Sequence, residues 1–421
     1  MKYKVYNCNS YRIHTIKTDK FKNCSMEIMF RNRLIKDEIT ANNMLVDMLM
    51  HSSKKFPKRR DVAIELENLY SASLRGFSTR IGNSVLLSFV LDFLNPKYCE
   101  DGYLNDVLAM PFEMLLNPNV GGNEEFDQRS FNIIKNRIKS DIDSLKENAA
   151  KYAIRRSLSN MDENSPSSYY MVGYMDDLEN ITPSSLVETY NDVLDNYVCD
   201  IYVIGNLDMD EVVSIIKKKF INKTIKQDKK ELYVDNQLRK KNINIEETGK
   251  YEQDSFVMIY NLDNLSKREK DFVIHLYNII LGSGGLTSKL YKYLREENSL
   301  CYNVSSMYQK YDGLLMIYSG IDAKDKDLCI KLVNKAMDEM KKGEFTSEEL
   351  DNAIKTVISS IKMSEDTQGG IINNYLFNDL DQLPLYDERV REFKTVTKEE
   401  IMNVAKKVKL NTIYLLKGEE E

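Results

Sequence analysis

The chain has 421 residues, of which 42% are hydrophobic and 29% charged, and its formal net charge is −6 at pH 7. This length suits two domains of roughly 200 residues each, and the mixed charge argues against a nucleic-acid-binding surface. The N-terminal residues lack the apolar core of a signal peptide, and no segment approaches the ~18 apolar residues of a membrane span, so we expect a cytoplasmic protein.

The six cysteines lie far apart and include no C-x-x-C pair. This spacing argues against a disulfide framework and against a thiolate zinc site, and we expect reduced thiols. The cysteines are Cys8, Cys24, Cys99, Cys199, Cys301 and Cys329.

In the first half of the chain, apolar patterns predict a strand at residues 26–30, helices at 40–52 and 61–70, and a strand at 84–95. Apolar residues at three- and four-residue spacing then predict a long helix over residues 129–161.

The second half repeats this order of elements. The patterns predict a strand at residues 256–260, helices at 270–282 and 288–298, a strand at 312–322 and a long helix at 347–364. Duplication of one α+β unit explains this repetition.

The two halves also end alike. Residues 181–208 and 396–420 each place a threonine, Thr182 or Thr397, before an amphipathic helix and a short apolar strand. Threonine at this position favours a helix N-cap. The sequence therefore predicts an α+β fold of two homologous halves, each a mixed β-sheet backed by helices.

A polar, lysine-rich segment separates the halves. We predict an N-terminal domain at residues 1–220, a linker at 221–250 and a C-terminal domain at 251–421. The later part of the linker can already enter the first strand of the second domain.

Several stretches resemble one family over almost the whole chain. They are HSSKKFPKRRDVAIELENLYSASLRG, LSFVLDFLNPKY, SKLYKYLREENSLCYNVSS, GLLMIYSGI and DTQGGIINNY. The family is that of the inverzincin peptidases, which includes pitrilysin, insulinase and the mitochondrial processing peptidases. The resemblance is strongest to the bacterial YmfF-like proteins, which are encoded beside a zinc-bearing relative, and it implies a clam-shell arrangement of the two halves.

The zinc motif of this family is degenerate here. Family enzymes carry H-x-x-E-H on the first apolar helix, where two His bind zinc and the Glu activates the zinc-bound water. The matching positions are Asn43, Val46 and Asp47, and Asn136 or Arg137 stands where a further Glu ligand is expected. We therefore expect no metal or cofactor on this chain and zinc only on a partner subunit. The chain has three histidines, His14, His51 and His275.

A second family motif is complete. Residues 294–302 read LREENSLCY, which matches L-R-E-x-x-x-L-x-Y. The resemblance implies that Tyr302 donates a hydrogen bond to the oxyanion of the tetrahedral intermediate and that Arg295 holds a substrate carbonyl. The alternative is an arginine at the end of a surface helix and a tyrosine packed in the core.

Glycines at Gly282, Gly284 and Gly285 lie between two predicted helices. They resemble the position of the glycine-rich loop of the processing-peptidase alpha subunit, which implies contact with substrate. The alternative is a helix C-cap and a tight turn. Residues 70–81 correspond to the edge strand on which family enzymes bind substrate as an added strand.

The resemblance implies a zinc-free subunit of a heterodimeric metallopeptidase that processes peptides or small proteins and is inactive alone. Its expected partners are a zinc-bearing homologous subunit and a peptide or small-protein substrate, with a homodimer possible for the isolated chain. One rival hypothesis is a peptide-binding or scaffold protein without a catalytic role. The other is an independent zinc peptidase with a rearranged site, against which Asn43, Val46 and Asp47 argue.

Overall fold

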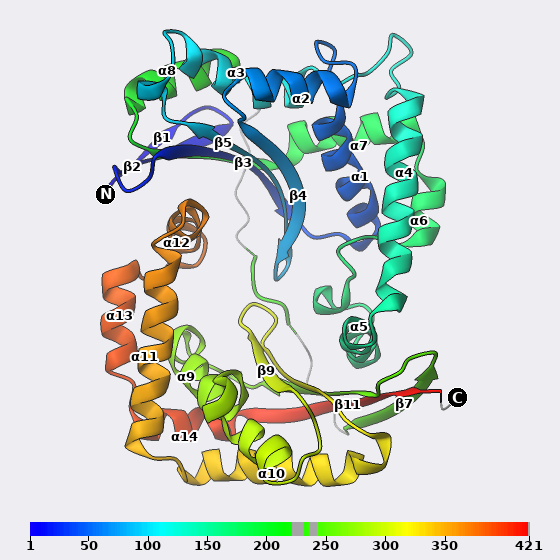
Figure 1. The fold of residues 1–421 in the computed structure, drawn as a ribbon, viewed down its shortest axis with the longest axis vertical. Helices are drawn as coiled ribbons and strands as arrows, with labels where there is room; N and C mark the ends of the chain where they lie inside the picture. The colour runs from blue at the N-terminus through cyan, green and yellow to red at the C-terminus, as the bar shows by residue number, and fades with distance from the viewer. Residues whose placement is uncertain (221–230, 236–241, 420–421) are drawn as a thin grey trace. The chain divides into compact units, whose positions relative to one another are not determined.

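A computed structural model describes residues 1–220, 231–235 and 242–419. The chain forms two compact units (Figure 1). The first unit contains Met1–Asp143 and Tyr170–Glu231, and the second contains Ser144–Tyr169 and Leu232–Glu421. Most of the predicted linker, at residues 221–230 and 236–241, lies outside the described residues.

The first unit is built on a six-stranded mixed sheet with the order β1-β2-β6-β3-β5-β4. β2 and β6 are parallel, and the other neighbours are antiparallel. Its central strands are buried along nearly their whole length, whereas the edge strand β4 alternates between exposed and half-buried side chains. The strands are β1 (Lys2–Asn7), β2 (Tyr11–Lys17), β3 (Asn23–Arg33), β4 (Ser73–Ile81), β5 (Ser84–Leu94) and β6 (Val198–Gly205).

Helices back this sheet, and α1 packs against β4 and against α4 and α7. The N-cap predicted at Thr182 is present, because its side chain accepts a hydrogen bond from the backbone N–H of Ser185 at 3.1 Å. The helices are α1 (Ile39–His51), α2 (Arg59–Asn68), α3 (Tyr103–Leu116), α4 (Gln128–Asp143), α6 (Met175–Asn180), α7 (Pro183–Asn196) and α8 (Met209–Lys219).

The second unit repeats the topology of the first without β1. Its order is β7-β11-β8-β10-β9, with β7 and β11 parallel and the other neighbours antiparallel. This correspondence confirms the predicted α+β fold of two homologous halves. The strands are β7 (Ile243–Gly249), β8 (Ser255–Leu262), β9 (Val304–Gln309), β10 (Leu314–Gly320) and β11 (Val408–Gly418), so β7 lies inside the segment predicted as linker.

The helices of the second unit follow the predicted order. Residues 269–283 form one continuous helical stretch, made of a π-helical turn, α9 and a second π-helical turn. The elements are η5 (Glu269–Val273), α9 (Ile274–Asn278), η6 (Ile279–Ser283), η8 (Tyr291–Glu296), α10 (Lys326–Lys342), α11 (Ser347–Ser364), α12 (Gln368–Asp381), α13 (Tyr386–Lys394) and α14 (Lys398–Lys406).

The helix predicted over residues 129–161 is divided. α4 ends at Asp143, and α5 (Ala149–Met161) begins after Asn148, whose side chain accepts a hydrogen bond from the backbone N–H of Lys151 at 2.9 Å. α5 packs on β8 and β11 of the second sheet (Figure 1). Residues 144–169 therefore belong to the second unit, although the sequence places them within the first predicted domain.

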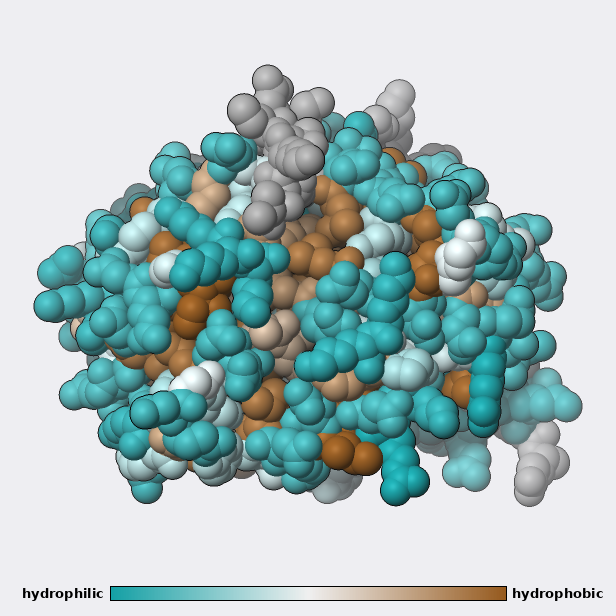
Figure 2. Space-filling view, turned by 90° about the horizontal axis from the view of Figure 1, so that it is seen from above, coloured by the Kyte–Doolittle hydropathy of each residue, from teal (hydrophilic) through white to brown (hydrophobic). Residues whose placement is uncertain are grey.

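The molecular face in Figure 2 shows mainly hydrophilic side chains with smaller hydrophobic areas between them. This pattern is expected where amphipathic helices turn their apolar sides toward a sheet. Within the described residues, no helix is both long and apolar enough to cross a membrane.

Candidate functional site

The three positions of the zinc motif lie on α1 and carry no zinc-binding arrangement. Val46 is buried, and its methyl carbon Cγ1 would lie 2.7 Å from a Cβ atom at Gly76 of β4. The Asn43 side-chain amide donates a hydrogen bond to the backbone carbonyl of Met171. Val46 thus fills the space against the sheet, and Asn43 fixes a neighbouring loop.

Asp47 forms an ion pair with Arg137 of α4. Of the two residues that the sequence places near the missing Glu ligand, Arg137 is therefore the one that reaches the motif helix. The Arg137 guanidinium thus neutralises the Asp47 carboxylate between α1 and α4. An arginine and an asparagine amide are poor zinc ligands, so the residues present do not fit the metal. Among the residues that the structure describes, no group of three or more His, Cys, Asp or Glu side chains is arranged to bind a metal ion.

Arg295 and Tyr302 lie side by side in the second unit. The Arg295 guanidinium donates a hydrogen bond of 2.6 Å to the backbone carbonyl of Tyr302, and its central carbon lies 4.5 Å from the centre of the Tyr302 ring. The Tyr302 residue is 79% exposed. The alternative of a tyrosine packed in the core is therefore wrong for Tyr302.

The backbone before Tyr302 is set by the end of η8. Ser299 has a left-handed φ of 54°, and the backbone N–H of Leu300 returns to the carbonyl of Leu294 at 2.8 Å. η8 itself is held on α10, because Lys289 and Tyr293 bind the Glu339 carboxylate at 2.8 and 2.6 Å. Burial raises the pKa of Glu339, but these two partners outweigh burial and hold that pKa below its usual value. Arg295 and Tyr302 thus rest on a fixed helix and a tight turn.

A pocket of about 410 Å³ opens beside Tyr302. One wall is the start of α5, and the floor is the face of β8 and β10 on which α5 packs. Sequence reasoning missed the contribution of α5, although Asn148 before two alanines is a helix-start signal. The lining residues are Glu147, Asn148, Ala149, Ala150, Gln253, Ser255, Phe256, Val257, Tyr302, Asn303, Tyr318, Ser319 and Gly320.

Gly282 lies in η6, and Gly284 and Gly285 lie in the tight connection between η6 and η8. A Cβ atom at Gly282 would lie 2.6 Å from side-chain atoms of Leu290 and Ser306, and one at Gly284 would lie 2.6 Å from a backbone oxygen. Gly285 has a left-handed φ of 61° and open space beside it. Packing and turn geometry therefore account for glycine at each position, and contact with substrate stays a prediction.

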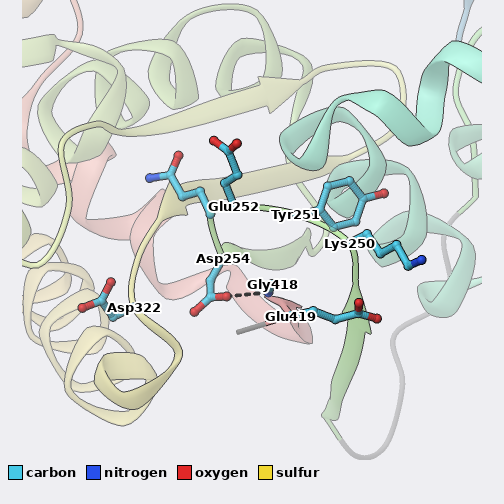
Figure 3. Close-up of a pocket in the computed structure, with 8 residues that line it drawn as sticks. Lys250, Tyr251, Glu252, Asp254, Asp322, Gly418 and Glu419 are labelled. Carbon is cyan, nitrogen blue, oxygen red and sulfur yellow. Dashed lines mark hydrogen bonds between the residues drawn. The ribbon is translucent and has the colours of Figure 1, made fainter. Parts of the chain in front are cut away.

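A second pocket, of about 800 Å³, lies where β7 and β11 end and β8 begins (Figure 3). It shares Gln253 with the pocket beside Tyr302 and is lined by four carboxylates. One of these, Asp254, accepts a hydrogen bond of 2.6 Å from the backbone N–H of Gly418 (Figure 3). Its other carboxylate oxygen accepts one of 2.6 Å from the backbone N–H of Ala323. Asp254 thus joins the end of β11 to the segment after β10.

Known proteins are similar to this chain in sequence and in fold. Residues 180–357 match the family model described as the Peptidase M16 inactive domain. The chain is 27% identical over 419 residues to the probable inactive metalloprotease YmfF of Bacillus subtilis (strain 168), covering 97% of this chain and 96% of that protein. It is 25% identical over 144 residues to the uncharacterized zinc protease YmxG of the same strain, covering 33% and 35% of the two chains.

Solved structures share the fold over the whole chain. A conserved protein from Enterococcus faecalis V583 superposes with a TM-score of 0.93 at 23% identity, covering 100% of this chain and 99% of that one. A peptidase M16 inactive domain from Pseudomonas fluorescens superposes with a TM-score of 0.81 at 16% identity and the same coverage. In its match to the inactive-domain model and to YmfF, and in its fold, the chain is similar to inactive proteins of the M16 peptidase family.

Proposed function

We propose that this chain is the zinc-free subunit of a two-chain M16 peptidase and supplies Arg295 and Tyr302 to the zinc site of a homologous partner. The observation that carries the proposal is the exposed phenol of Tyr302. Its hydroxyl has no hydrogen-bond partner among the described residues, while Arg295 holds the ring and the backbone of the same residue. An oriented, unpaired donor is what stabilisation of an oxyanion requires.

The test is hydrolysis of a mixed peptide pool by this chain, by a zinc-bearing homologue, and by an equimolar mixture of the two. Activity is expected only in the mixture. Tyr302→Phe should leave assembly intact and lower turnover by roughly 100- to 1000-fold, the effect of removing one oxyanion donor. Tyr291→Phe is the matched control, because Tyr291 also stacks on Arg295, at 5.1 Å, and has no proposed role.

A peptide-binding protein without a catalytic role is the second candidate, and the edge strand β4 favours it. β4 ends the first sheet, pairs with β5 on one side, and exposes 41% of Phe77. Backbone groups on such an edge can pair with an added peptide strand. Unchanged turnover of the mixture after Tyr302→Phe would favour this candidate over the catalytic one.

A further inference from the structure

The pocket beside Tyr302 contains backbone hydrogen-bond donors that lack a partner. The N–H groups of Ala149 and Ala150, in the first turn of α5, donate to no residue that the structure describes. The following donor, the N–H of Lys151, is capped by the Asn148 side chain. Uncapped N–H groups at a helix start carry partial positive charge and favour an anion.

Ser255 gives an independent indication from the floor of the same pocket. Ser255 is 7% exposed, and its hydroxyl has no hydrogen-bond partner within the described parts of the chain. Val257 and Ile259 lie on the same face of β8 and pack against α5, so strand alternation turns Ser255 toward the start of this helix. Because Ser255 lines the pocket and its oxygen is not among the fully buried polar atoms, the hydroxyl is free to donate to an oxygen atom of a ligand there.

The remaining walls fit a chain segment larger than a small ion. The Tyr318 ring, on the face of the sheet that packs against α5, supplies apolar surface, and the volume of about 410 Å³ lies in the range of ligand pockets. We propose that this pocket binds the carboxylate at the C-terminal end of a peptide, with Ala149 N–H, Ala150 N–H and the Ser255 hydroxyl as donors. Capture of chain ends by backbone N–H groups is an established mode of peptide recognition.

This inference deepens the proposed function, because Tyr302 forms a wall of the pocket and a bound peptide end would lie next to it. Binding of the carboxylate nevertheless depends on the second unit alone. The proposal therefore has its own test, in which no partner subunit and no catalysis are involved.

Negative charges near the pocket oppose this binding to a limited extent. Glu147 carries the single carboxylate among the lining residues and is exposed to solvent. In the adjoining acidic pocket of Figure 3, Asp254 already accepts two backbone hydrogen bonds, while Glu252 and Glu419 are exposed and screened by salt. Glu147→Gln should therefore strengthen binding of a carboxylate.

The experiment is calorimetric titration of the full-length chain with acetyl-Ala-Ala-Ala as the free acid and as the C-terminal amide. The acid should bind roughly tenfold or more tightly than the amide. Ala149→Pro should lower the affinity for the acid toward that for the amide, because it removes one of the three proposed donors. Proline suits this first helical position, and Asn148 before it already has the extended backbone that proline requires, with φ −118° and ψ 102°.

Ala149→Ser is the matched control, because it keeps the backbone N–H and should bind the acid as the wild type does. Ser255→Ala should weaken binding of the acid and leave binding of the amide unchanged. Equal affinity for acid and amide would overturn the proposal, as would full affinity for the acid in Ala149→Pro. A loss of turnover in Tyr302→Phe together with such a result would leave the proposed function standing without the carboxylate pocket.

Discussion

At the residue scale, each of the three positions of the degenerate zinc motif contacts a neighbouring residue of the first unit. Asn43 donates to the Met171 carbonyl, Asp47 pairs with Arg137, and Val46 packs against Gly76. Each replacement has a partner that a histidine or glutamate at the same position would have to displace. Restoring the motif on α1 alone would therefore leave Arg137 facing the new ligands and would not rebuild a zinc site.

Another cluster of single residues controls how the first unit responds to acid. Asp200 of β6 is buried and accepts hydrogen bonds from Arg12 at 2.6 and 2.9 Å and from His14 at 3.2 Å. Burial raises the pKa of Asp200, but the hydrogen bonds and charges of His14 and Arg12 outweigh burial and lower this pKa to about 2.

Because the pKa of Asp200 is lower in the folded state, its contribution to stability is fully present above about pH 4 and is lost as the pH falls toward about 2. We expect this contribution to be about 2 kcal/mol. Urea unfolding of the wild type and of Asp200→Asn, at about pH 5 and about pH 2, measures it. The variant should lose less stability between these pH values than the wild type.

Asp322→Asn provides the control for this measurement. The Asp322 side chain is 72% exposed, so its replacement should leave the pH dependence as in the wild type. The same loss of stability with acid in Asp200→Asn and in the wild type would show that Asp200 is not the responsible group.

At the element scale, α1 lies so close to β4 that Gly76 admits no side chain. A Cβ atom there would lie 2.7 Å from Val46 Cγ1 and 2.8 Å from Met50 Cγ. Gly76→Ala should lower the free energy of unfolding by about 1–3 kcal/mol, the usual cost of overpacking. Adding Val46→Ala should restore part of this loss, because the two residues share one space.

Thermal unfolding of the two single variants and of the double variant measures the coupling between the two sites. Gly369→Ala is the comparison, because a Cβ atom at Gly369 meets nothing within 4 Å and alanine favours the helix. If the effects of Gly76→Ala and Val46→Ala on the free energy of unfolding were strictly additive, the two side chains would not occupy the same space between α1 and β4.

The sequence predicts the helices and strands better than it predicts which of them pack together. The apolar pattern at residues 84–95 predicts β5 almost to the residue, and this strand is buried along nearly its whole length. The pattern at 129–161 is helical throughout, but it cannot show that the chain turns at residues 144–148 or that α5 is buried on the other sheet. Likewise, the motif at residues 294–302 brings Arg295 and Tyr302 together in the sequence, and they are in contact in the structure. The pocket wall at Ala149 depends instead on a contact between segments that are distant in the sequence, which no local pattern predicts.

At the scale of the whole molecule, the repeat and the folding units do not coincide. The two sheets share one strand order, yet the second is covered by α5, which precedes the end of the first repeat in the chain. Ala153, Leu158 and Met161 of α5 are buried in one cluster with Val257 and other residues of β8, β10 and β11. The core of the second unit therefore contains a helix from the first half of the sequence.

The contact between α5 and the second sheet is polar as well as apolar. Arg156 binds Glu247 of β7 through its Nε atom at 3.0 and 3.2 Å, and the Tyr414 hydroxyl donates to the same carboxylate at 2.9 Å. Burial raises the pKa of Tyr414, and its hydrogen bond to Glu247 adds to this effect. Removal of α5 would thus expose apolar side chains and also leave Glu247 without its cation.

This arrangement predicts that the second half cannot fold without α5. A fragment of residues 232–421 should show no cooperative thermal transition by near-ultraviolet circular dichroism, because the α5 face of its sheet is uncovered. Adding a peptide of residues 144–169 should restore the transition. The same peptide with Leu158→Ala should bind more weakly, since that truncation costs about 2–5 kcal/mol in a packed core. Cooperative unfolding of the fragment alone, unchanged by the peptide, would mean that the repeat and not the burial of α5 defines the folding unit.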